Sequence, residues 1–435
     1  MIKVCKFGGT ALADGTSINR IKEIIEKDSE RRYIVVSAPG KRFKDDIKVT
    51  DLLYTTYQSV LETGTCGLEF EKVKNRFRAI VQELSLSIDI DNILVTTEKE
   101  IVRQKDRDFT ASRGEYLSGI IMANLLNVPF IDPRNIVRFT RGKLDSKKTY
   151  ELTCSALQGK EHAVIAGFYG ADNKGNIVTF SRGGSDITGA IVARAINANL
   201  YEKWTDVDGF LACDPQIVEN PLHIRELSYT QLRSLAYVGA DVLHGDSIFP
   251  VREIGIPIQI KNYLNPEEYG TDILPSVECS SNESKPLGIA GKKDLLIIYI
   301  RNHRLNNDPV QMRQIFSIFD KYNFTFEHVF CGITTISIVV KEEKWKSPLK
   351  EQILNEIANT VRPEEMIVYD KVSIVALVGN NMDSTENLSR FIMATDLTDV
   401  NLKIVDQAVS ETTIMLVFRN GIFKRVIDAI YKEFF

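Results

Sequence analysis

Short apolar runs alternate, over about the first 275 residues, with longer segments in which apolar residues recur every three or four positions. The short runs predict buried strands, and the recurrence of apolar residues every three or four positions predicts helices that cover those strands. Ile18, Ile21, Ile24 and Ile25, for example, would share one face of a helix after the first strand. This alternation indicates an α/β fold with an open, mainly parallel sheet between helices. Strands are expected at 2–7, 33–37, 128–131, 163–167, 177–180 and, as the last of this part, 256–261.

Polar residues set the expected helix starts and breaks. One helix begins at Thr50 after a charged loop, and the region from about 59 to 110 reads as further helices. Ser112-Arg113-Gly114-Glu115 is expected to begin another, which would place Glu115 in a first turn, where a carboxylate favours the helix dipole. Residues 227–242 are expected to be helical. The glycine-rich stretch after 167 is expected to be the loop of a hairpin whose far arm is 177–180.

The residues from about 290 to the end contain an internal repeat. Leu295–Asn302 (L-L-I-I-Y-I-R-N) aligns with Ser373–Asn380 (S-I-V-A-L-V-G-N) at an offset of 380 − 302 = 78 residues. Each copy reads strand, helix, strand, strand, helix, as two ferredoxin-like βαββαβ units would. Small sheets of this kind have exposed edges and tend to pair, within or between chains. The polar stretch Glu278–Pro286 is the expected boundary, which divides the chain into domains at 1–285 and 290–435.

Composition narrows the class of protein. The chain has 435 residues, 44% hydrophobic and 26% charged, with a net charge of −4, which is ordinary for a globular protein of two or three domains and gives no sign of nucleic-acid binding. Six scattered cysteines lack a C-x-x-C pair and five histidines lack an H-E-x-x-H motif, so neither disulfides nor a protein-bound metal site are expected. The sequence shows no signal peptide or long apolar stretch, which favours a cytoplasmic protein without a membrane partner.

A glycine-rich turn joins a strand to a helix at Val178–Ala190, V-T-F-S-R-G-G-S-D-I-T-G-A. Ser185 or Asp186 is expected to cap that helix, whose first N–H groups can face an anion. Arg182 offers a planar fork for a carboxylate or phosphate, and Asp186 could orient a metal or a lysine. A capped turn with a solvated arginine is the structural alternative for this stretch alone.

Three other segments carry candidate chemistry. Lys6-Phe7-Gly8-Gly9-Thr10 follows the first strand and places a lysine beside backbone N–H groups that can hold phosphates, although a tight turn explains it equally well. Glu115 could pair with a substrate ammonium group. The polar loop in Glu202–Pro215 follows a strand, where a nucleotide could sit in an open α/β sheet, and its alternative is a plain surface turn.

Together these blocks resemble the aspartokinases, which have the amino-acid kinase fold. The resemblance covers residues 2 to about 275 and rests on K-F-G-G-T, V-V-S-A, S-R-G-E, G-F-x-G, S-R-G-G-S-D, W-T-D-V-D-G and D-P. The C-terminal repeat resembles the tandem ACT domains of the same enzymes. Because the chain leaves no room for a fused homoserine dehydrogenase, it resembles a monofunctional member.

The resemblance implies ATP-dependent phosphorylation of L-aspartate, with Mg²⁺, to 4-phospho-L-aspartate, the first step of lysine, threonine and methionine biosynthesis. It implies inhibition by lysine, threonine or both at the ACT domains, and a homodimer or tetramer. Glu115 would bind the aspartate ammonium, Arg182 a carboxylate, and Asp186 would orient Lys6 or the magnesium. The other implied contacts are Lys6, Gly8, Gly9 and Ser37 to the ATP phosphates, Thr50 to aspartate, Gly183, Gly184 and Ser185 at the reaction centre, and Thr205, Asp206 and Asp214 to the nucleoside.

Two segments depart from the family pattern. Many members have a basic residue in G-A-K-V-L-H-P, where this chain reads G-A-D-V-L-H-G with Asp241 and Gly245. Lys261, or Lys41 and Arg42, are the candidates to supply the missing charge. The first repeat reads R-N-H-R-L-N-N-D-P-V and F-C-G-I-T-T, without the glycine–phenylalanine pair and S-T-S-E-like strand of many lysine-sensitive members, so the effector stays open.

Two other functions compete with this interpretation. One is a different amino-acid kinase, acting on acetylglutamate or glutamate. Glu115 argues against acetylglutamate, whose acylated amine carries no positive charge. The second is an amino-acid-binding regulator with a decayed kinase part, which only Asp241 favours.

Overall fold

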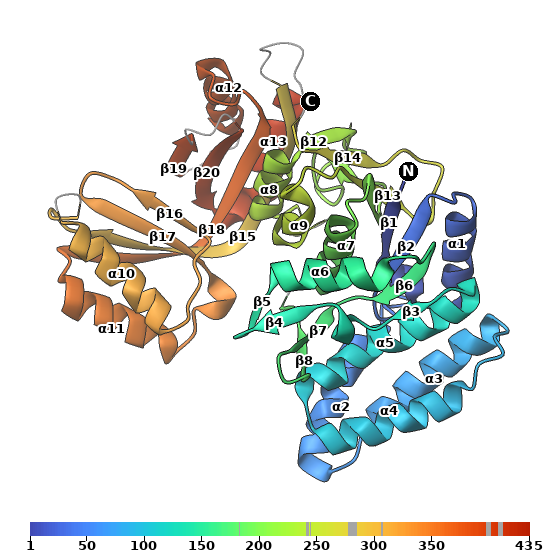
Figure 1. Cartoon of the computed structure of the whole chain (residues 1–435). Helices are drawn as coiled ribbons and strands as arrows, with labels where there is room; N and C mark the ends of the chain where they lie inside the picture. The colour runs from blue at the N-terminus through green and yellow to red at the C-terminus, as the bar shows by residue number, and fades with distance from the viewer. Residues whose placement is uncertain are drawn as a thin grey trace. The chain divides into compact units, whose positions relative to one another are not determined.

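The computed structural model describes residues 1–181, 183–240, 243, 245–276, 285–305, 308–396, 402–407 and 412–435 (Figure 1). Its contacts divide the chain into two compact units. The first consists of Met1–Phe210, His223–Arg233 and Asp241–Glu278, and the second of Leu211–Leu222, Ser234–Ala240 and Cys279–Phe435. The polar boundary expected at Glu278–Pro286 lies largely outside the described residues.

The first unit is built on an eight-stranded sheet, in the order β12-β14-β13-β9-β1-β2-β6-β3. From β13 to β3 every neighbouring pair is parallel, which confirms the predicted mainly parallel sheet. The prediction that β13 is the last strand of this part was wrong, because β14 follows β13 in the chain and pairs antiparallel with it. The strands are β1 (Lys3–Phe7), β2 (Arg31–Val36), β3 (Phe130–Ile131), β6 (Ala163–Ala166), β9 (Leu200–Thr205), β12 (Glu226–Ser228), β13 (Ile258–Asn262) and β14 (Thr271–Leu274).

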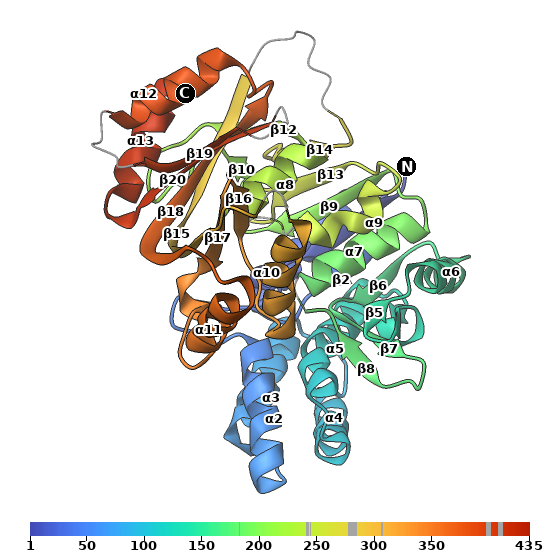
Figure 2. The same ribbon diagram turned by 90° about the vertical axis from the view of Figure 1, so that its left-hand side faces the viewer.

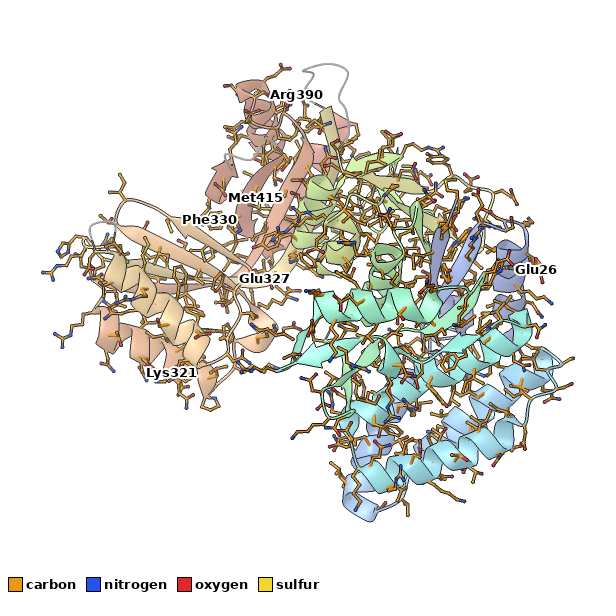
Figure 3. The ribbon with its side chains drawn as sticks, in the orientation of Figure 1. Glu26, Lys321, Glu327, Phe330, Arg390 and Met415 are labelled. Atoms are coloured by element: carbon orange, nitrogen blue, oxygen red, sulfur yellow. The ribbon has the colours of Figure 1, made fainter. Side chains whose placement is uncertain are left out.

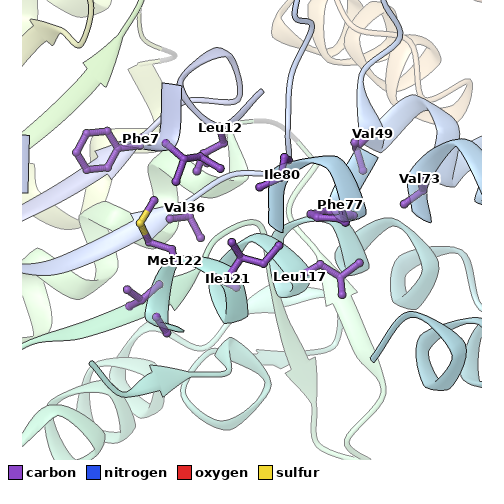
Figure 4. Packing of buried hydrophobic residues seen from close by; sticks show 14 of the residues in the cluster. Phe7, Leu12, Val36, Val49, Val73, Phe77, Ile80, Leu117, Ile121 and Met122 are labelled. Atoms are coloured by element: carbon purple, nitrogen blue, oxygen red, sulfur yellow. The ribbon is translucent and has the colours of Figure 1, made fainter. Parts of the chain in front are cut away.

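Helices cover both faces of this sheet. Phe7 and Val36 point to one face, where they pack with Leu117, Ile121 and other apolar residues of the helical layer in a single buried cluster (Figure 4). The helix α7 packs on β1, β2 and β9, on the face that carries Lys6. The helices are α1 (Gly15–Glu26), α2 (Val49–Thr63), α3 (Gly67–Glu83), α4 (Ile90–Gln104), α5 (Arg107–Leu126), α6 (Ser146–Leu157), α7 (Gly184–Ala195), α8 (Tyr229–Val238) and α9 (Phe249–Arg252), with short 3₁₀ turns η1 (Thr10–Leu12), η2 (Pro133–Asn135) and η3 (Gly245–Ile248).

The helix α5 begins earlier than the sequence pattern predicted. Asp106 caps it by accepting a hydrogen bond of 2.6 Å from the Phe109 backbone N–H, so the first turn starts at Arg107. Glu115 therefore lies in the middle of the helix, where the dipole explanation for its carboxylate no longer applies. The predicted first-turn position was wrong because Asp106, and not Ser112, supplies the cap.

A second, four-stranded sheet lies in the first unit in the order β5-β4-β7-β8. Part of the predicted glycine-rich loop is itself a strand, β7, which forms an antiparallel hairpin with β8. The hairpin was therefore predicted with the correct far arm and the wrong near arm. These strands are β4 (Arg138–Thr140), β5 (Lys143–Leu144), β7 (Tyr169–Asp172) and β8 (Ile177–Thr179), and a separate short pair is formed by β10 (Phe210–Leu211) and β11 (His223–Ile224).

The second unit contains one antiparallel six-stranded sheet in the order β16-β17-β15-β18-β20-β19. Both copies of the predicted repeat have the expected strand–helix–strand–strand–helix order. Figure 2 shows the helices α10 and α11 together in one half of this unit, and α12 and α13 together in the other. The elements are β15 (Lys285–Arg301), α10 (Pro309–Lys321), β16 (His328–Cys331), β17 (Thr335–Lys341), η4 (Glu342–Lys344), α11 (Leu349–Val361), β18 (Glu365–Asn380), α12 (Thr385–Asp396), β19 (Leu402–Gln407), β20 (Thr413–Arg419), η5 (Asn420–Ile422) and α13 (Phe423–Phe434).

Two long strands join the repeats within the chain. The later part of β15, Leu295–Arg301, pairs with the early part of β18, while the early part of β15 pairs with the later part of β18. Each repeat thereby gains a strand from the segment that precedes the other. Salt bridges tie the helices of each half, from Lys321 to Glu356 at 2.8 Å and from Arg390 to Glu433 at 2.7 Å. Figure 3 labels Lys321 and Arg390.

Among the residues that the structure describes, none of the helices has the length and apolar content needed to cross a membrane.

Candidate active site

The carboxyl ends of β9, β1, β2 and β6 meet at one edge of the large sheet, because these neighbours are parallel. Backbone hydrogen bonds tie the loops that follow them. The Gly8 N–H donates to the Trp204 carbonyl at 3.1 Å, the Gly40 N–H to the Gly9 carbonyl at 2.7 Å, and the Gly167 N–H to Val36 at 2.8 Å. Ligands of open α/β sheets bind at this edge, so it is the expected place for a site.

Several glycines at this edge are required by close packing. A Cβ on Gly40 would lie 2.7 Å from the Gly9 carbonyl carbon, and one on Gly167 would lie 2.6 Å from the Ser185 Cβ. A Cβ on Gly8 would instead meet only the Trp204 carbonyl at 3.5 Å and the Lys6 Nζ at 4.0 Å. The backbone at Gly8 is therefore open beside the ammonium group of Lys6.

Lys6 and Asp186 form a buried ion pair at this edge. The Lys6 Nζ lies 2.7 Å from the Asp186 Oδ1, and the two side chains are 8% and 11% exposed. Asp186 lies in the first turn of α7, but neither it nor Ser185 caps the helix as predicted. Gly183 is the N-cap, with φ of 56°, and no side chain closes the first turn. Because the glycine starts the helix before Ser185, the Asp186 carboxylate is available to the lysine.

Lys203 on β9 is a second lysine at Asp186, and the sequence interpretation missed it. Its Nζ lies 3.1 Å from the Asp186 Oδ2, and its side chain is 8% exposed. Burial alone would raise the pKa of Asp186, but the positive charges of Lys203 and Lys6 outweigh it and lower that pKa to about 2. Lys203 is the register partner of Lys6 on the neighbouring parallel strand. Only the pairing of β1 with β9, which is not local in sequence, identifies it.

A buried polar network fixes β9 from the opposite face of the sheet. The Arg31 Nε lies 2.8 Å from the Glu202 Oε2, which also accepts a hydrogen bond of 2.9 Å from the Trp204 indole. The Arg31 guanidinium lies over the Trp204 ring. Since side chains alternate along a strand, this anchoring on Glu202 and Trp204 directs Lys203 toward Asp186.

Glu115 projects from α5 as a buried carboxyl group, 5% exposed. Burial raises its pKa to about 8, against the smaller effects of backbone N–H donors at Ala38 and Glu115 and of the Lys6 charge. No hydrogen-bond partner reaches its Oε2 from the described residues. Gly114 lets this turn of α5 press on the loop after β2, since a Cβ there would lie 2.6 Å from the Ala38 Cβ. Glu115 is thus held beside that loop with one oxygen ready for a donor.

Ser37 and Thr50 flank the same loop. Ser37 follows β2 directly and is partly exposed. Thr50 lies in the first turn of α2, which is tied to the loop by a hydrogen bond of 3.1 Å from the Val49 N–H to the Pro39 carbonyl. The structure thereby brings Lys6, Gly8, Gly9, Ser37, Thr50, Glu115, Gly184, Ser185 and Asp186 to the same edge of the first unit.

The residues expected to hold the nucleoside are divided between the two units. Thr205 and Asp206 end β9 in the first unit, where the Thr205 hydroxyl donates to the Asp206 Oδ1 at 3.2 Å. Asp214 belongs to the second unit, where its Oδ1 accepts a hydrogen bond of 2.8 Å from the Gln216 N–H. Their joint role therefore stays a prediction.

Other expected charges lie elsewhere or outside the described residues. Arg182 and Asp241 are both outside them. Lys261 is the register partner of Trp204 and lies over its ring, on the face of the sheet opposite Lys6. The Lys41 ammonium donates to the Lys44 carbonyl, and Arg42 pairs with Asp46.

Metal binding by the protein alone has little support in the part of the chain that is described, which holds no group of three His, Cys, Asp or Glu side chains placed to share an ion. Mg²⁺ commonly binds through one or two carboxylates together with substrate phosphates and water. The buried carboxylate of Asp186 fits such a shared site better than a dedicated metal centre.

Comparison with known proteins adds a whole-chain likeness. Residues 1–262 match the amino acid kinase family. Aspartokinase 3 of Bacillus subtilis is 30% identical over 451 residues, which cover 100% of this chain and 99% of the relative. The crystal structure of Clostridium acetobutylicum aspartate kinase is 39% identical with a TM-score of 0.86, and each chain is covered to 100%.

Escherichia coli aspartokinase III has the same fold at lower identity. Its structure with aspartate and ADP has a TM-score of 0.80 at 21% identity, and its structure with lysine and aspartate has 0.77 at 22%. Both matches cover 100% of this chain and 99% of that chain.

Proposed function

Since the chain belongs to the amino acid kinase family and, within it, to the aspartokinases, we propose that it transfers the γ-phosphoryl group of ATP to the β-carboxylate of L-aspartate. The products are 4-phospho-L-aspartate and ADP, at the start of the route to lysine, threonine and methionine. The likeness to a curated aspartokinase over the whole chain carries this proposal. The buried Lys6, Glu115 and Asp186 at one sheet edge support it.

The reaction needs positioning and charge neutralisation more than proton transfer. A β-carboxylate oxygen attacks the γ-phosphorus, the bond to the β–γ bridging oxygen breaks, and ADP leaves with the electron pair. The attacking carboxylate is already ionised at pH 7, so no general base is required. Two anions must nevertheless meet, and the Lys6 ammonium with the open backbone at Gly8 offers donors for the phosphate oxygens.

Glu115 would hold the α-ammonium group of aspartate. Its buried Oε2 accepts no hydrogen bond from the described residues, and a buried carboxyl group gains most from a cationic donor. Thr50, in the first turn of α2, would contact the substrate, and Arg182 would bind one of its carboxylates. Ser185 and Gly184 would line the reaction centre. Together these contacts would select a free amino acid with a short acidic side chain.

Mg²⁺ would neutralise charge on the ATP phosphates, held by their oxygens and by the buried Asp186 carboxylate. The nucleoside would contact Thr205 and Asp206.

ADP release tests this proposal through its substrate dependence. We expect steady release with Mg²⁺, ATP and L-aspartate. Replacement of L-aspartate by N-acetyl-L-aspartate, which keeps both carboxylates but loses the ammonium group, should abolish it. Equal rates with the two compounds would contradict the Glu115 assignment, and no aspartate-dependent release would contradict the proposed reaction.

The second unit would regulate the kinase by binding an amino acid, with lysine and threonine as the candidates. It contains a shallow pocket of about 360 Å³ on the sheet, whose lining includes Tyr299, Phe330, Thr335 and Ser337. Their hydroxyl groups and aromatic faces suit an amino acid. Assays with each candidate at millimolar concentration identify the effector, and indifference to both would leave this unit without its proposed ligand.

A further inference from the structure

Two lysines on neighbouring strands share one carboxylate at the proposed reaction centre. Lys6 faces the Asp186 Oδ1 at 2.7 Å and Lys203 faces the Oδ2 at 3.1 Å. The two lysines are register partners in a parallel pair, so they leave the same face of the sheet at the same distance from its edge. Lys203 therefore occupies on β9 the position that Lys6 occupies on β1.

We propose that the Lys203 ammonium group contacts the γ-phosphoryl group of ATP together with Lys6. This inference rests on the proposed function. A phosphoryl group in transfer spreads negative charge over three oxygens, and one lysine point charge cannot neutralise all of them. An ammonium group has three N–H donors, so a lysine that donates to Asp186 can also donate to a phosphate oxygen.

Asp186 acts in this arrangement as the positioning residue for both cations. Each of its oxygens faces one ammonium group, and its main chain is fixed because the Tyr201 hydroxyl donates to the Asp186 carbonyl at 3.0 Å. Lys203 is held from the other face of β9 by the Glu202 and Trp204 network. The two ammonium groups are thus ordered before any substrate arrives, which is the condition for electrostatic stabilisation of a transferring group.

Two other candidate cations, Lys261 and Arg42, make their contacts elsewhere. Lys261 lies over the Trp204 ring on the opposite face of the sheet, and Arg42 pairs with Asp46 at 2.9 Å on an exposed loop. Lys203, in contrast, is buried and reaches the carboxylate that Lys6 also reaches.

A matched control distinguishes a purely structural role for Lys203 from contact with the phosphoryl group. Lys3 lies on the neighbouring strand β1, at the end opposite Lys6. Its side chain is 15% exposed, and its Nζ is 2.7 Å from the Asp28 Oδ2 and 3.3 Å from the Glu30 Oε2. Lys203→Met and Lys3→Met therefore each remove a largely buried Lys–Asp pair from the same sheet, and Lys3→Met also removes the pair with Glu30. Only Lys203 lies at the carboxyl edge.

The experiment measures kcat, the thermal midpoint, and the dissociation constants of ADP and a non-hydrolysable ATP analogue for the full chain and three variants. We expect Lys203→Met to lower kcat about 100-fold, as loss of one preorganised donor does. The same substitution should raise the dissociation constant of the ATP analogue at least tenfold more than that of ADP. Lys203→Arg should recover part of both losses. Lys3→Met should lower only the thermal midpoint.

Equal weakening of ADP and the ATP analogue by Lys203→Met, or a kcat within threefold of the parent, would overturn the proposal. The nucleotide measurements need no aspartate. If the parent chain did not phosphorylate aspartate, the proposed function would fail. The effect of Lys203→Met on the binding of the ATP analogue compared with ADP would still decide whether Lys203 contacts the terminal phosphate.

Discussion

At the scale of single residues, the protonation of Glu115 is the feature with the most direct consequence for substrate binding. Burial raises its pKa to about 8, so the carboxyl group is largely neutral at pH 7 before aspartate binds. An ammonium group binds best to the ionised form. Binding of aspartate should therefore release a proton from Glu115, and affinity should increase as pH rises toward 8.

This coupling predicts the behaviour of Glu115→Gln. In the parent, the KM for aspartate should fall between pH 6 and pH 8. The variant should raise KM roughly 10- to 100-fold at pH 8, as expected for a lost hydrogen bond to a charged group, and its KM should no longer depend on pH in this range. Glu62→Gln, on the exposed surface of α2, is the control and should match the parent. A parent KM that is flat between pH 6 and pH 8 would contradict the coupling.

The same pKa fixes the sign of an effect on stability. The folded protein keeps a proton on Glu115 that the unfolded chain releases near the ordinary pKa of 4.5. The stability that the protonated Glu115 allows is therefore fully present below pH 4.5 and is lost as pH rises through about 8. We expect the parent to lose stability relative to Glu115→Gln over this range, measured as denaturation midpoints at pH 5 and pH 8. A constant difference between the two proteins would contradict it.

Residues in local motifs could be predicted, whereas residues defined by strand pairing could not. Lys6 and Asp186 were identified because glycines and a strand end mark them in the sequence. Lys203 stands in an ordinary strand pattern, and its role depends on the register with Lys6, nearly two hundred residues away. The role of Glu115 as a substrate contact stays a prediction, and its expected position in a first helical turn was wrong, since the cap that starts the helix is Asp106.

At the scale of elements, the contact between the loops after β1 and β2 shapes the phosphate side of the site. The Gly40 N–H donates to the Gly9 carbonyl at 2.7 Å. A Cβ on Gly40 would lie 2.7 Å from the Gly9 carbonyl carbon and 2.9 Å from the Thr10 nitrogen. Both neighbours are backbone atoms, which cannot move aside as a flexible side chain can.

Gly40→Ala should therefore push the two loops apart. We expect a loss of about 1–3 kcal/mol in the free energy of unfolding, typical of overpacking, together with a higher KM for ATP. Gly421→Ala is the control, because an added Cβ there has no atom within 4 Å. Denaturation midpoints and ATP kinetics of both variants check the expectation, and a Gly40→Ala protein with the parent's midpoint and KM would refute it.

Elements with strong local patterns were predictable, and short paired strands were not. The strands β2 and β6 contain the apolar runs Y-I-V-V and A-V-I-A, and α1 shows clear helical spacing. The strand β7 covers four residues in a glycine-rich segment, and β14 follows the strand predicted to be the last. Their extended conformation is set by hydrogen bonding to neighbouring strands, which propensity does not reveal.

At the scale of the whole molecule, two segments from the middle of the chain belong to the second unit. Residues 211–222 and 234–240 cluster with the C-terminal repeats. Cys213 and Val218 lie in the same buried core as Leu377, Phe391 and Phe418. The repeat itself was predictable from its 78-residue offset, but this long-range packing leaves no local sign in the sequence.

This packing predicts that the first unit is not an independent kinase. A chain that ends at Ser276 would expose Cys213 and Val218, and each buried apolar side chain of this kind contributes about 1.5–3 kcal/mol. We expect the truncated chain to unfold at a lower temperature than the full chain, or to aggregate, measured by calorimetry and light scattering. A soluble truncated protein with the full kcat would contradict this expectation.

The most direct test of the central claim is to trap the acyl phosphate. The full chain, with Mg²⁺, ATP, L-aspartate and hydroxylamine, should yield aspartyl hydroxamate in an amount equal to the ADP released. Lys6→Ala should reduce this yield roughly 100- to 1000-fold, as expected for loss of a charge-stabilising donor. Absence of hydroxamate from the parent chain, or equal yields from the parent and Lys6→Ala, would contradict the proposed reaction at this site.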